Sequence, residues 1–162
     1  MRRRVRLPAD DVWSHLEDTA AYRRWWPWLQ LFDASGGLTA GATWRAGIRA
    51  PLPYVVSFTL DLTTVDATDH VVEAHVTGDV TGSATIGMAT PDGDADGDGD
   101  GGPATDLRMT WRLTPASSFL RLLDATARPV ARWGHDTVMR RSVDAFVAAV
   151  EQTPPPWRST SR

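Results

Sequence analysis

A histidine and two arginines are the residues of this chain whose types could do chemistry. His135 can titrate near neutrality and act as a general acid or base. Arg49 and Arg128 carry guanidinium groups that could hold a carboxylate or an enolate. All three also fit an ordinary structural role, as a hydrogen-bonded histidine at a helix edge and as solvated arginines. The sequence therefore leaves the catalytic assignment open.

A second set of residues is suited to binding rather than to reaction. Tryptophans supply flat apolar surface and one N–H donor each, which suits a planar ligand. The same side chains would serve equally well as core. The predicted ligand-binding residues are Trp25, Trp26, Trp44, Tyr54, Phe58, Met88, Met109, Trp111, Trp133, His135 and Met139.

Composition excludes several kinds of chemistry. The chain has no cysteine and all 17 basic residues are arginine, which rules out disulfides, thiolate nucleophiles and Schiff bases formed on lysine. The four histidines lack ligand spacing, so we expect no metal and no cofactor. The segment Asp92-x-Asp94-x-Asp96-Gly97 matches half of a calcium loop, but Pro103 stands where the bidentate glutamate belongs. We interpret residues 91–106 as a flexible Asp/Gly-rich hairpin loop.

Charge and hydropathy limit the partners. The net charge is −3. Six aspartates lie in the 91–106 region, so the rest of the chain has a net charge of about +3, and neither value indicates a nucleic-acid-binding surface. No apolar run is close to the length of about 18 residues that a membrane-spanning helix needs. The basic start lacks an apolar signal region, so the cytoplasm is the expected location. The shortness of the first strand leaves open whether Met1 is the natural start.

The elements that must position these residues follow from periodicity. Residues 2–7 predict a strand, Asp10 or Asp11 can cap a helix through about Asp18, and Pro27 breaks a second short helix. From residue 30 to 114 the apolar period is two, which predicts about six antiparallel strands. The predicted inward positions of the four strands between 54 and 113 are almost entirely apolar, which argues against an enzyme.

One long helix is predicted over residues 116–151, with a kink at Pro129. Its predicted buried stripe consists of small residues, with Trp133, Met139 and Phe146 at the margins. The stripe is Leu120, Leu123, Ala127, Ala131, Gly134, Val138, Ser142, Ala145 and Ala149.

The order of these elements resembles a known superfamily. Its supporting features are Tyr22-x-x-Trp25-Trp26-Pro27, Gly41 ahead of Trp44, the Gly78-Asp79-Val80-x-Gly82 hairpin, and the stretch from Arg128-Pro129 to His135-Asp136. Residues 2–151 resemble the SRPBCC, or START-like, superfamily of Bet v 1-type helix-grip proteins, and within it the polyketide cyclase/dehydrase branch. The resemblance implies a curved sheet wrapped around the last helix, with a cavity for an apolar small molecule.

The sequence thus predicts an α+β helix-grip domain of about seven strands over residues 1–152, with a disordered tail at 153–162. The leading functional hypothesis is binding of an apolar aromatic, polyketide-like or acyl molecule by a monomer or homodimer. One alternative is an aromatase/cyclase-type enzyme. Another is a non-enzymatic module whose core is filled by its own tryptophans, which a cavity well below about 300 Å³ would indicate.

Overall fold

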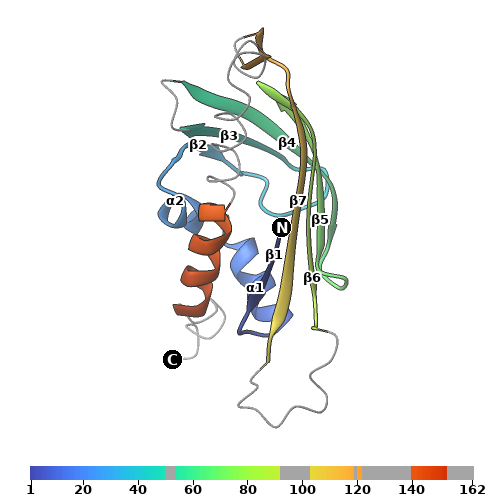
Figure 1. Ribbon diagram of the computed structural model, residues 1–162. Coiled ribbons are helices and arrows are strands. Elements are labelled where there is room, and N and C mark those ends of the chain that lie inside the picture. The colour runs from blue at the N-terminus through green and yellow to red at the C-terminus, as the bar shows by residue number, and fades with distance from the viewer. Residues whose placement is uncertain (50–53, 92–102, 119, 122–139, 153–162) are drawn as a thin grey trace.

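The computed structural model describes residues 1–49, 54–91, 103–118, 120–121 and 140–152 (Figure 1). The helical elements are α1 (Ala9–Glu17), the short 3-10 turn η1 (Thr19–Ala21) and α2 (Tyr22–Trp25), and residues 140–152 are also helical. The strands are β1 (Arg2–Val5), β2 (Leu29–Asp33), β3 (Thr43–Arg49), β4 (Val55–Asp66), β5 (Val71–Gly78), β6 (Val80–Ala89) and β7 (Thr105–Pro115).

The strands form one antiparallel sheet in the order β1-β7-β6-β5-β4-β3-β2. Consecutive strands from β2 to β7 are neighbours, whereas β1 crosses to the far edge and pairs with β7, Arg3 lying opposite Leu107. The sheet curves, and α1, α2 and the C-terminal helix lie together on one side of it (Figure 1). The predicted fold class, α+β with seven strands and a C-terminal helix, is confirmed.

The alternation of side chains explains which face of the sheet is covered. In β5, Val72, Ala74 and Val76 are buried while Glu73 and His75 between them are exposed. A register shift between Leu62 and Thr64 interrupts the β4–β5 ladder, and such irregularities bend a strand. One apolar face and one polar face are the result, so the apolar face requires a cover.

Helix α1 begins at Ala9, two or three residues earlier than a cap at Asp10 or Asp11 predicts. Pro8 occupies the N-cap position without a side-chain cap, so neither Asp10 nor Asp11 caps the helix. Both carboxylates lie instead in the first turn, where they offset the positive end of the helix dipole. The predicted inner face, Val12, Trp13 and Leu16, is buried.

The predicted stripe of the C-terminal helix is wrong in the part that the structure describes. Val143, Phe146 and Val150 are buried, with 4%, 3% and 1% of their surface exposed, whereas Ser142 and Ala145 are half-buried. The helical period is as predicted, but the face is rotated by one residue. Bulky side chains remove more apolar area from water than alanines, so they take the inner position.

Strand β1 ties this helix to the sheet. Arg3 Nε donates to Asp144 Oδ1 at 2.9 Å, and the Arg6 backbone N–H donates to Glu151 Oε1 at 3.0 Å. On the strand's other side Arg2 and Arg4 pair with Asp106, and the hydrogen bond from Arg2 holds the pKa of that carboxyl below its ordinary value. These contacts fasten the C-terminal helix to the β1 edge of the sheet.

Gly82 offers a test of this sheet geometry. Its φ is +147°, and a Cβ there would overlap the carbonyl oxygen of Arg112 in the neighbouring strand. We expect Gly82→Ala to lower the free energy of unfolding by about 2–4 kcal/mol, measured by urea denaturation. Gly87→Ala on the same strand is the control, because a Cβ there meets nothing within 4 Å. Equal effects of the two substitutions would contradict the described strand path.

Candidate functional site

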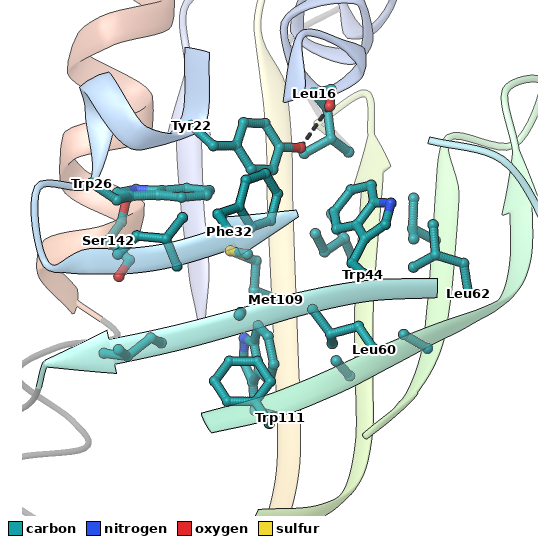
Figure 2. Close-up of a pocket in the computed structure, with 18 of the residues that line it drawn as sticks. Leu16, Tyr22, Trp26, Phe32, Trp44, Leu60, Leu62, Met109, Trp111 and Ser142 are labelled. Carbon is teal, nitrogen blue, oxygen red and sulfur yellow. Dashed lines mark hydrogen bonds between the residues drawn. The ribbon is translucent and has the colours of Figure 1, made fainter. Parts of the chain in front are cut away.

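A pocket of about 130 Å³ lies between the inner face of the sheet and the helices (Figure 2). Every strand from β2 to β7 contributes to it, and α1, α2 and the C-terminal helix supply the opposite wall. The sheet contributes chiefly Phe32, Trp44, Ala46, Phe58, Leu60, Leu62, Val72, Ala74, Ala84, Ile86, Met109 and Trp111. The helical layer contributes Leu16, Tyr22, Ser142 and Val143, and the segment after α2 adds Trp26 and Trp28.

Tyr22 is the centre of an aromatic cluster at one wall of the pocket. Its ring stacks on Phe32 with centroids 5.3 Å apart, and meets Trp26 and Trp44 edge to face at 4.8 and 5.9 Å. Stacked and edge-to-face pairs both match the charge distribution of aromatic rings. Because Tyr22 is only 3% exposed, these contacts fix the wall rather than leave it adaptable.

The polar atoms of this wall are used within the protein. The Tyr22 hydroxyl donates to the Leu16 carbonyl at 2.6 Å (Figure 2). Trp26 Nε1 donates to the Ser142 carbonyl, and Trp44 Nε1 to the Gly37 carbonyl, each at 2.8 Å. Burial raises the pKa of the Tyr22 phenol well above 10.0, so the phenol stays neutral near pH 7.

Five of the predicted ligand-binding residues line the pocket: Trp26, Trp44, Phe58, Met109 and Trp111. The other three in the described part of the chain, Trp25, Tyr54 and Met88, are not among the lining residues. Trp25 packs edge to face on His15 and Phe146. A hydrogen bond to Asp79 raises the pKa of Tyr54.

Of the three catalytic candidates, the structure describes Arg49 alone, and Arg49 is not among the residues that line the pocket. Arg49 is exposed, and its backbone N–H donates to the Trp28 carbonyl at 3.0 Å. Arg128 and His135 lie outside the described residues, as do the predicted ligand contacts Trp133 and Met139.

Sequence reasoning missed several lining residues near the start of the sheet. Trp28, Leu29, Phe32 and Leu38 all face the pocket. The register of β2 against β3 shifts between Leu29 and Leu31, so the apolar period of two is broken there. The aromatic density of residues 22–32 was the one available signal.

The described lining can hold an apolar molecule but offers little for a reaction. Among these residues, Tyr22 is the only side chain with a titratable group, and its hydroxyl is buried and engaged. A general acid or base has to reach the reacting atom in a usable protonation state. The described wall is therefore an apolar surface that carries one buried, neutral phenol.

The fold and pocket are those of a helix-grip protein, a curved sheet closed by helices over an apolar cavity. Residues 1–151 match the profile of the family described as polyketide cyclase/dehydrase and lipid transport, so the chain belongs to this family. The superfamily assignment made from the sequence is confirmed.

Solved structures share this fold at low sequence identity. The Zhui aromatase/cyclase from Streptomyces sp. R1128 is 19% identical with a TM-score of 0.67, covering 94% of this chain and 89% of that one. A conserved protein from Geobacillus kaustophilus is 10% identical with a TM-score of 0.68, covering 94% of both chains. Norcoclaurine synthase from Thalictrum flavum is 15% identical with a TM-score of 0.60, covering 94% and 92%.

A search of curated proteins by sequence found no significant match. In the part of the chain that the structure describes, no helix is long and apolar enough to cross a membrane.

The Tyr22 hydrogen bond gives a prediction with a pH signature. Tyr22→Phe leaves the Leu16 carbonyl, at the end of α1, without this donor, and we expect a loss of about 1–2 kcal/mol of stability at pH 7. Above pH 10 the unfolded phenol ionises while the buried one stays protonated, so the wild type loses stability as pH rises.

The deficit of Tyr22→Phe should therefore shrink as pH rises above 10, in urea denaturation repeated between pH 7 and 11. A deficit that grows with pH would contradict the buried, neutral state of this phenol.

Proposed function

We propose that this protein binds one small apolar molecule in the pocket between the sheet and the helices. The observation that carries the proposal is the pocket's lining, which is apolar and comes from both layers. Family membership supports it, since the family description includes lipid transport. An apolar ligand gains by leaving water, and no described charged group has to be buried with it.

The volume sets the size of the ligand. At about 130 Å³ the pocket is near the about 150 Å³ of an engineered cavity that takes up benzene. It is below the about 300 Å³ at which drug-sized ligand pockets begin. We therefore propose a ligand of about one aromatic ring, or a short acyl segment. A polycyclic molecule would need the aromatic wall around Tyr22 to move.

The same volume favours one competing function. A core filled by the protein's own side chains would leave a void of this order, and Trp26, Trp44 and Trp111 are among the side chains that line it. An aromatase/cyclase activity, in contrast, has no support from the described lining, whose one titratable side chain is Tyr22.

Location and assembly complete the proposal. We propose a cytoplasmic protein that acts as a monomer or homodimer. Its lack of cysteine fits a reducing compartment.

Ala84 provides the test, because its side chain lines the pocket from the middle of β6. Toluene at about ten times its Kd should raise the melting temperature of the wild type by about 3–6 °C and quench tryptophan fluorescence. Ala84→Leu fills the pocket, so we expect it to abolish both effects.

Thr85→Leu is the matched control, since residue 85 follows on the same strand and points to the opposite face of the sheet. It should bind toluene like the wild type. Absence of any response in wild-type protein, across toluene and short-chain fatty acids, would identify the pocket as a self-filled core.

A further inference from the structure

The aromatic hydrogen-bond donors of the pocket wall divide into two groups. Three aromatic side chains with an N–H or O–H group donate within the protein, namely Tyr22, Trp26 and Trp44. Two more lining residues, Trp28 and Trp111, carry an indole N–H for which the described structure holds no acceptor. Trp28 and Trp111 are both half-buried, and neither N–H is among the fully buried unpaired polar atoms of the described residues, so an acceptor on an incoming ligand can reach these two groups.

Trp111 is the better placed of the two. It lies in β7, directly opposite Ala84 of β6, and this ladder fixes its backbone. Its indole nitrogen is on the side of the ring toward Met109 (Figure 2), another lining residue of the same strand. Trp28, in contrast, lies in the turn between α2 and β2. A donor on a regular strand holds a ligand group in a defined position better than one on a turn.

The surroundings of Trp111 explain why one acceptor would be selected. Met109 and Ala84, its neighbours on the inner face, have no N–H or O–H in their side chains. The Trp111 N–H therefore stands in an apolar region where a hydrogen bond is stronger than in water.

We propose that the ligand carries a single hydrogen-bond acceptor, such as a carbonyl oxygen, and that Trp111 Nε1 donates to it. This inference rests on the proposed binding function and makes it more specific. The substrate class becomes a compact aromatic or acyl carbonyl compound rather than a plain hydrocarbon. Trp111 is then the residue that sets specificity, while the aromatic wall around Tyr22 sets size.

Benzaldehyde and styrene form a suitable pair of probes, because they have nearly the same shape and only benzaldehyde has an acceptor. The chain has no lysine with which the aldehyde could condense. Both are titrated into ¹⁵N-labelled protein, and the indole N–H signals are followed by NMR. The signal that is missing from Trp111→Phe identifies Trp111 among the eight tryptophans.

We expect benzaldehyde, but not styrene, to move the Trp111 indole signal downfield. Trp111→Phe should weaken benzaldehyde binding relative to styrene binding by about threefold to tenfold, the range for one neutral hydrogen bond. Trp28→Phe is the matched control, which should weaken the binding of both probes by the same factor.

Three results would overturn the inference. The first is that styrene binds while Trp111→Phe leaves the ratio of the benzaldehyde and styrene affinities unchanged. In that case the proposed hydrogen bond from Trp111 to the ligand is wrong, while the proposed binding function stands. If Trp28→Phe changes that ratio instead, the assignment to Trp111 is wrong. If neither probe binds wild-type protein, the proposed function itself fails.

Discussion

The apolar inner face of the sheet imposes the constraint on which the rest of this structure depends. Six consecutive strands present their apolar side chains to one side, and an antiparallel sheet of this kind is stable only if that side is covered. The cover comes from both ends of the chain. Helices α1 and α2 follow the first strand, and the last helix inserts Val143, Phe146 and Val150. Because the sheet curves, the cover does not fill the concave face completely, and the pocket is the space that remains.

The tryptophans decide how much of that space remains. Trp26 and Trp44 are held by hydrogen bonds to the Ser142 and Gly37 carbonyls, so their rings are fixed parts of the wall. The space that they leave, about 130 Å³, limits the proposed ligand to about one ring. Their own indole N–H groups are engaged within the protein. The indole N–H of Trp111 has no such partner among the described residues, so it is a polar group in an otherwise apolar pocket. The balance between binding and self-filling thus rests on a few aromatic side chains rather than on the fold.

The sequence predicts the fold better than the pocket, for identifiable reasons. The period of two in β4 and β5 makes Leu60, Leu62, Val72 and Ala74 inward-facing without knowledge of their partners. Phe32 was not predicted as a lining residue, because the register of β2 against β3 shifts just before it. The buried face of the last helix was predicted one residue out of position, because the helical period alone does not determine which face is buried. Whether Ala145 or Phe146 takes the inner position depends on what the sheet can accommodate. Met88 shares the inward alternation of β6 yet lies outside the lining, since a cavity occupies only part of a face. Tyr54 also lies outside the lining, because it precedes the first residue of β4.

The pairing of β1 with β7 has a consequence for the order of events during synthesis. The two strands are separated by about a hundred residues, and the Met1 ammonium group reaches the Met109 carbonyl. Such distant pairing is slow because the intervening chain must be ordered first. Strand β1 is made before β7 and therefore has no partner in the sheet until β7 has emerged from the ribosome. Until then Val5, fully buried in the finished protein, is exposed to water and to other nascent chains.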